Sequence, residues 1–167
     1  MQTEFDILSK VADLVGGRVD VKRVTNLVDI LHRGGHWIHG VQHSDDLGLI
    51  NSQGIKPLAA EGGWVSYWTT GQRVFTATSN TKSELFGIDS SFFHYAKAAF
   101  VITNDNLLSR YGVLGSANGD LAQIHSAVPR DAMAILDVRS IGSQEAKFEF
   151  LERTIKKGYR GGDYFRF

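Results

Sequence analysis

Near the carboxyl end, residues 147–151 read Lys-Phe-Glu-Phe-Leu, an alternation of polar and apolar side chains. Successive side chains of a β-strand point to opposite faces, so this alternation predicts a strand with Phe148 and Phe150 on one face and Glu149 on the other. We expect this strand, from Glu145 to Leu151, to close a sheet. Glu149 is then either a solvent-facing carboxylate or a functional residue of a binding or catalytic site.

The length of the chain favours one domain. With 167 residues, 43% hydrophobic and 22% charged, the chain can fill one core but is short for two. We expect residues 1–167 to form a single domain, in which residues 1–35 are a helical segment and residues 36–167 are the main body.

Composition excludes several classes of chemistry. There is no cysteine, which excludes disulfides, thiolate metal sites and cysteine nucleophiles. Lys plus Arg and Asp plus Glu both count 18, so the net charge does not indicate a strongly basic nucleic-acid binder. No apolar run is long enough to span a membrane and no leader is visible, so we expect a soluble cytoplasmic protein with no membrane partner.

Helical patterns fill the first part of the chain. Apolar residues recur at helical spacing over residues 3–15 and 20–33, and each run stops at a pair of glycines. Next, residues 36–42 mix aromatic, β-branched and polar side chains and predict a strand that carries His39. A helix follows, with Ser44 as N-cap and Gly54 at its C-cap. A structural histidine is the alternative for His39.

An aromatic segment occupies residues 62–75. It holds four aromatic rings and Arg73 within fourteen residues. Tyr67 and Trp68 could stack on a planar ring and Arg73 could pair with a phosphate. The alternative is an ordinary strand with tryptophans in the core. A serine- and threonine-rich loop is expected over residues 76–87.

The segments between residues 97 and 138 give the remaining elements. Residues 97–103 and 133–138 are apolar enough for buried strands, and residues 104–110 form a capped helical turn. Residues 111–122 are rich in Gly, Ser, Asn and Asp, which predicts an irregular loop.

Three of these pieces, in this order, resemble segments of the DarT-type DNA ADP-ribosyltransferase toxins, members of the ADP-ribosyltransferase superfamily. Residues 65–73 resemble an aromatic strand that runs into a catalytic arginine. Residues 107–122 resemble the segment with a Gly-Asn-Ala-type turn, and residues 147–151 resemble the glutamate strand. His39 and the helix that ends at Gly54 resemble the first strand and helix of the superfamily. The family strand usually reads His, one residue, Thr, whereas here Gly40, Val41 and Gln42 follow His39.

The resemblance implies an α+β fold in which a bent or split, mostly antiparallel sheet surrounds an NAD cleft, with the two N-terminal helices packed outside. It implies an NAD-dependent mono-ADP-ribosyltransferase that releases nicotinamide and modifies a macromolecule, with a base in single-stranded DNA as acceptor. Protein or RNA acceptors stay open, and an antitoxin protein is a possible partner. The implied catalytic residues are Glu149 and Arg73. The implied NAD contacts are His39, Gln42, Tyr67 and Trp68, and no metal is implied.

A fixed carboxylate suits this chemistry, because breaking the nicotinamide–ribose bond builds positive charge on the ribose. The alternative function is a non-catalytic ligand- or partner-binding α+β module with Glu149 on its surface. The two functions differ in geometry: in the enzyme, His39, Arg73 and Glu149 must converge on one cleft.

Overall fold

The structure is a computed structural model of the 167-residue chain, and it describes residues 27, 30–31, 33–56, 58–60, 63–68, 96–118 and 121–167. The helix predicted over residues 3–15, the loop predicted over residues 76–87 and Arg73 lie outside these residues.

The described elements alternate short strands with helices. In chain order they are β1 (His36–Val41), α3 (Ser44–Gln53), β2 (Leu58–Ala60), β3 (Gly63–Trp68), β4 (Ala99–Asn104), α6 (Asp105–Arg110), β5 (Gly115–Asn118), β6 (Leu121–Ile124), the 3-10 turn η1 (Arg130–Ala132), β7 (Ala134–Asp137), α7 (Gln144–Lys157) and β8 (Tyr164–Arg166). The predicted α+β class is confirmed.

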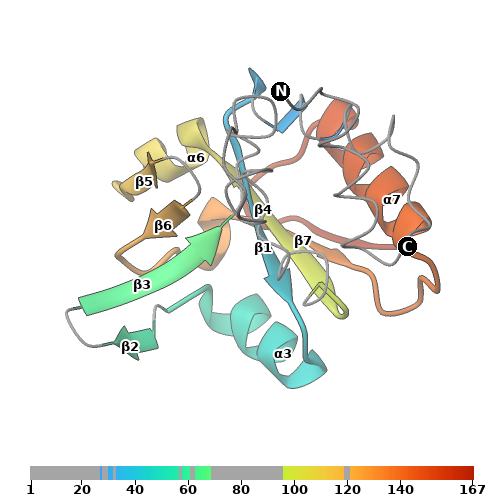
Figure 1. Ribbon diagram of the computed structural model, residues 1–167, viewed down its shortest axis with the longest axis horizontal. Coiled ribbons are helices and arrows are strands. Elements are labelled where there is room, and N and C mark those ends of the chain that lie inside the picture. The colour runs from blue at the N-terminus through green and yellow to red at the C-terminus, as the bar shows by residue number, and fades with distance from the viewer. Residues whose placement is uncertain are drawn as a thin grey trace, which may run out of the picture.

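The described strands form two sheets (Figure 1). The first sheet has the order β1-β4-β7-β8 and is antiparallel except for the parallel pair β7–β8. The second has the order β2-β3-β6-β5 and is antiparallel throughout. Among the described strands, every pair except β7–β8 is therefore antiparallel.

The first sheet is covered on both faces. Ile38, Phe100 and Ile102 lie in one core cluster with apolar residues of α7. The residues that alternate with them, Trp37 and Val101, lie in a second cluster with residues of α3 and of the second sheet. Figure 1 shows the same order, with α7 on one side of β4 and β7 and the second sheet on the other.

The N-terminal helical pattern is confirmed where the structure describes it. Leu27, Ile30, Leu31 and Arg33 are helical. Leu27 and Leu31 are fully buried in the α7 cluster, so this segment covers the same face of the first sheet as α7 does.

Local signals place β1 and α3 where the sequence predicts them. The helix begins at Ser44, with His43 rather than Ser44 at the N-cap and no side-chain capping bond. It ends at Gly54, whose φ of 76° is unfavourable for other residues. The predicted Asn104 turn is also confirmed: the Asn104 side chain accepts a hydrogen bond from the Leu107 amide at the start of α6.

The predicted strand over residues 145–151 is wrong, because these residues belong to the fourteen-residue helix α7. The Ser143 side chain caps the helix by accepting a hydrogen bond from the Ala146 amide, and Gly158 ends it with φ 90°. Phe148, Leu151 and Ile155 recur at spacings of three and four residues and all are buried. β8 instead occupies the edge of the sheet beside β7.

The irregular loop predicted over residues 111–122 is also wrong in its second half, which forms the β5–β6 hairpin. Packing requires a glycine at position 115, because a Cβ there would overlap the Trp37 ring. The Trp37 indole N–H in turn donates to the Asp105 carboxylate at 2.8 Å. The small residues of this segment therefore allow the hairpin to lie close against β1.

Two neighbouring substitutions test α7. Phe148→Ala should destabilise the protein by about 3–5 kcal/mol, because it leaves a cavity in the core. Glu149→Ala should change the free energy of unfolding by less than about 0.5 kcal/mol, because Glu149 is exposed. Urea denaturation of both variants measures the difference, and equal losses would contradict the assigned helix face.

Candidate functional site

His39 and Trp68, two of the predicted NAD contacts, lie side by side. His39 is half-buried on β1 and pairs with Val101 of β4. Its ring centroid lies 5.3 Å from that of Trp68 on β3, with the planes tilted by 47°. Trp68 is 5% exposed and its indole N–H donates to the Ser66 hydroxyl at 2.8 Å. The indole is therefore held in place and fixes one side of the His39 ring.

The other predicted NAD contacts are only partly placed. Gln42 is half-buried and lies in the link between β1 and α3, three residues after His39. The Tyr67 backbone lies in β3 and pairs with Gln123 of β6, and its side chain is outside the described part of the structure. Arg73 also lies outside it.

The structure does not bring Glu149 to His39. Glu149 is exposed on α7, between the buried Phe148 and Phe150. α7 packs on the face of the first sheet that carries Ile38. His39 alternates with Ile38 along β1 and contacts Trp68 on the opposite face. The sheet thus separates the two residues, because the stretch that carries Glu149 is a helix on the sheet and not a strand in it.

A cluster of polar residues that the sequence prediction missed lies at the β7–β8 edge. Asp137, at the end of β7, is 3% exposed. Arg139 binds its two carboxylate oxygens through Nε at 3.0 Å and Nη2 at 2.7 Å. The Tyr164 hydroxyl donates to Oδ2 at 2.6 Å, and Arg166 Nε lies 3.6 Å from the same oxygen. The sequence contained a signal for this cluster. A buried aspartate in an apolar strand needs hydrogen-bond or charge partners, and Arg139 is two residues away.

These contacts hold Asp137 in its charged form. The Arg139 hydrogen bonds lower the pKa of Asp137 far below its usual value, and the Tyr164 hydrogen bond acts in the same direction against the effect of burial. The same pairing raises the pKa of Arg139. Asp137 therefore fixes the directions of the side chains around it.

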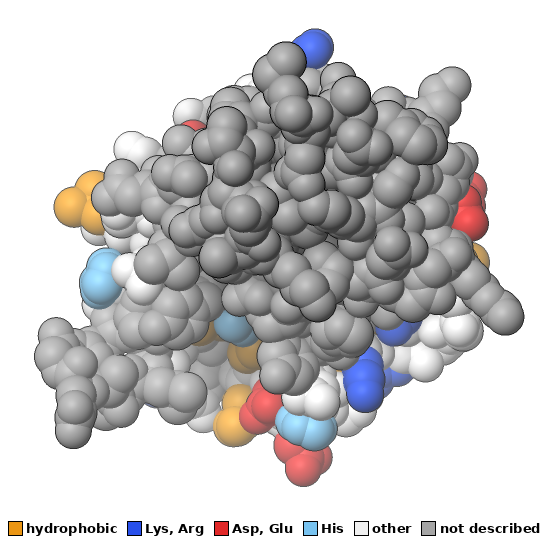
Figure 2. Space-filling view, viewed as in Figure 1, with side chains coloured by type: hydrophobic (Ala, Val, Ile, Leu, Met, Phe, Trp, Pro, Cys, Tyr) orange, Lys and Arg blue, Asp and Glu red, His pale blue; other side chains and the backbone are white. Residues whose placement is uncertain are grey.

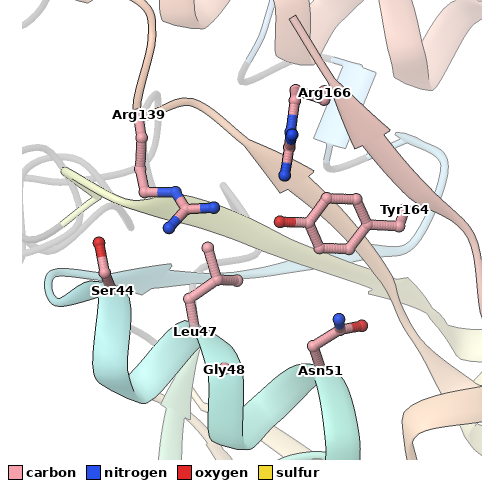
Figure 3. A pocket seen from close by; sticks show the side chains of 7 residues that line it. All are labelled: Ser44, Leu47, Gly48, Asn51, Arg139, Tyr164 and Arg166. Carbon is pink, nitrogen blue, oxygen red and sulfur yellow. The ribbon is translucent and has the colours of Figure 1, made fainter.

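A cavity of about 320 Å³ opens beside this cluster (Figure 3). One wall is a face of α3 and the other is formed by side chains at the ends of β7 and β8. Its lining residues are Ser44, Leu47, Gly48, Asn51, Arg139, Tyr164 and Arg166. Figure 2 shows Lys and Arg side chains beside acidic and histidine side chains near the place that α3 occupies in Figure 1.

A second polar network joins β1 to the segment after α7. The Tyr159 hydroxyl donates to the Thr103 carbonyl at 2.9 Å and accepts from the Asn104 amide at 3.2 Å. It also lies 2.8 Å from His36 Nδ1, which must be the donor because the hydroxyl proton is already engaged. Burial lowers the pKa of His36 and raises that of Tyr159. This network holds neutral groups and stabilises the fold.

The chain matches no family model, no curated protein and no solved structure. Within the described ranges, no helix is long and apolar enough to cross a membrane. The same ranges contain no group of three His, Asp or Glu side chains placed to hold a metal ion.

Removing the Asp137 charge should weaken the fold. Asp137→Asn loses charge-assisted bonds to Arg139 and should cost about 2 kcal/mol at pH 7. Because the folded pKa of Asp137 is lowered, its stabilisation is present above about pH 4 and is lost as the pH falls further. The variant should therefore lose less stability than the wild type between pH 5 and pH 2.

Thermal melting at several pH values measures this effect. Asp131→Asn, which removes an exposed carboxylate, is the matched control and should keep the pH dependence of the wild type. A pH dependence that is unchanged in Asp137→Asn would show that the Arg139 pair does not stabilise the fold.

Proposed function

We propose that this chain is an NAD-dependent mono-ADP-ribosyltransferase that transfers ADP-ribose to a macromolecular acceptor and releases nicotinamide. The observation that carries the proposal is the contact between His39 of β1 and Trp68 of β3. The strand that ends before α3 and the aromatic strand are far apart in sequence, and the resemblance to ADP-ribosyltransferases expects both of them at the NAD cleft. The split, mostly antiparallel arrangement of the sheets agrees with the same family.

His39 is the residue that we assign to NAD. Its ring is half-buried and supported on one side by Trp68, so its orientation is restricted before a substrate binds. An imidazole held in this way can form a hydrogen bond to a ribose hydroxyl at a small cost in side-chain entropy. Gln42, in the following link, offers an amide to the same substrate.

Trp68 takes a positioning role in this proposal. With 5% of its surface exposed and its indole N–H bonded to Ser66, it has little face left for stacking on nicotinamide. Arg73 keeps its predicted role of binding phosphate or activating the acceptor, and Tyr67 keeps its role beside a planar ring.

We assign no catalytic role to Glu149. Positive charge develops on the ribose when the glycosidic bond breaks, and a carboxylate stabilises this charge only from close by. Glu149 lies on α7, across the first sheet from His39, and the strand that supported its assignment is absent. Single-stranded DNA is the acceptor that the resemblance implies, with RNA and protein as further acceptors to test.

A non-catalytic binding module is the second candidate function. It is favoured by one observation, the separation of Glu149 from His39, because a module needs no convergence of these residues. The cavity between α3 and β8 would also serve a protein that only binds.

An assay with labelled NAD distinguishes the ADP-ribosyltransferase from the binding module. The purified protein, incubated with NAD labelled in its adenylate half and with single-stranded DNA, RNA and protein acceptors, should label one acceptor and release nicotinamide. His39→Asn should lower the labelling rate by about tenfold or more, because it removes a positioned contact to the substrate. His125→Asn, which changes an exposed histidine, is the matched control and should label at the wild-type rate.

The Glu149→Gln variant tests, in the same assay, whether Glu149 is a catalytic residue. We expect its labelling rate to stay within about twofold of wild type, because the substitution changes an exposed helix residue. A loss of about a hundredfold would return Glu149 to the catalytic site. Absence of labelling on every acceptor, in a wild type shown by melting to be folded, would favour the binding module.

A further inference from the structure

The cavity between α3 and the β7–β8 edge carries hydrogen-bond donors on both walls. Arg139 and Arg166 supply guanidinium groups from one wall, and their side chains are 41% and 69% exposed. From α3, Ser44 supplies a hydroxyl, and Asn51 keeps its amide N–H groups as donors because its Oδ1 accepts from Arg130. Figure 3 shows the two guanidinium groups and the Tyr164 hydroxyl above the α3 side chains.

The charge at the cavity is positive. Asp137, the carboxylate that binds both arginines, is buried behind them and is not a lining residue. Asp137 binds Nε and Nη2 of Arg139, and its contact with Arg166 is longer, at 3.6 Å. Two cations against one carboxylate leave a net charge of one positive unit. Asp45 and Asp46, also on α3, are exposed and do not line the cavity.

Arg139 is oriented before any ligand binds, and Arg166 is held more loosely. Arg139 is fixed by Asp137, and the Arg166 guanidinium lies 6.0 Å from the centre of the Tyr164 ring. Planar guanidinium groups match the oxygens of a phosphate, and fixing them in advance lowers the entropy cost of binding. A phosphate monoester carries about 1.5 to 2 negative charges at pH 7, and two guanidinium groups can pair with its oxygens.

The cavity is larger than a phosphate ion needs. Its volume of about 320 Å³ lies at the lower end of the range of roughly 300–1,000 Å³ seen for small-molecule sites. Leu47 and Gly48 give it a wall without charge beside the arginines. A Cβ built on Gly48 would meet nothing within 4 Å, so the space over this residue is open.

We propose that this cavity binds a small phosphate monoester, with the phosphate between Arg139 and Arg166 and the organic part over Leu47 and Gly48. The site differs from the one assigned to NAD. His39 pairs with Val101, Val101 with Ile135, and Ile135 with Tyr164, so three strand spacings of about 4.8 Å separate His39 from the cavity edge. The proposal does not depend on the ADP-ribosyltransferase activity.

Titration calorimetry on the full chain tests the site with three probes at constant ionic strength: ribose 5-phosphate, inorganic phosphate and ribose. We expect ribose 5-phosphate to bind, inorganic phosphate to bind more weakly, and ribose not to bind. Inorganic phosphate binding as tightly as the monoester would overturn the place given to the organic part. Binding of ribose alone, or of no probe, would overturn the site.

Two pairs of variants locate the binding. Arg166→Gln should weaken ribose 5-phosphate by about tenfold or more, whereas Arg153→Gln, the same charge change on the exposed surface of α7, should leave it within about twofold. Gly48→Leu should fill the cavity and abolish binding. Gln53→Leu, on the opposite face of α3, should not.

Thermal melting checks that all four variants are folded. Arg166 and Gly48 are exposed, and Gly48 lies inside a helix where leucine has the higher helix propensity, so neither substitution should unfold the protein. Equal losses in Arg166→Gln and Arg153→Gln would mean that the phosphate responds to overall charge, and would overturn the proposed site.

Discussion

The buried β4–β7 pair is the constraint on which the rest of the structure depends. Phe100, Val101 and Ile102 of β4 have no exposed surface, and neither do Ile135 and Leu136 of β7. A strand pair that is apolar on both faces must be covered on both, since leaving either face in water would cost about 25 cal/mol for each Å² of apolar surface. The covering layers are α7 with the N-terminal helical residues on one face, and α3 with the second sheet on the other.

This two-sided core decides which polar residues can share a site. His39 with Trp68, and Tyr164 with Asp137, lie on the face that carries α3, at the two edges of the first sheet. Glu149 lies beyond the other face, on α7. A carboxylate on that helix cannot act on a substrate at His39 without crossing the sheet. A site that includes His39 or Tyr164 therefore lies on the α3 face of the first sheet.

The sequence predicted correctly those elements whose signals act over only a few residues. β1, α3 and the Asn104 cap were predicted correctly because a strand pattern or a capping residue acts within a few positions. α7 was missed because five residues of period-two alternation outweighed the helical repeat over fourteen, although Ser143 and Gly158 marked its ends.

The features that the sequence did not predict depend on contacts between segments that are distant in the chain. Gly115 is required at its position because the Trp37 ring lies against it, and no local pattern indicates this contact. The cluster around Asp137 joins residues 27 positions apart, so the cavity beside it could not be read from one segment. The contact between His39 and Trp68 joins two separate strands, and no local spacing indicates it.

Amide hydrogen exchange tests the two-sided core most directly. We expect the slowest exchange at the amides of Phe100–Ile102 and Ile135–Leu136, with an opening free energy equal to that of global unfolding. Amides of the β5–β6 hairpin, at the edge of the second sheet, should exchange faster. Exchange of the β4 and β7 amides as fast as that of the hairpin would show that the central pair is not the element on which the fold depends.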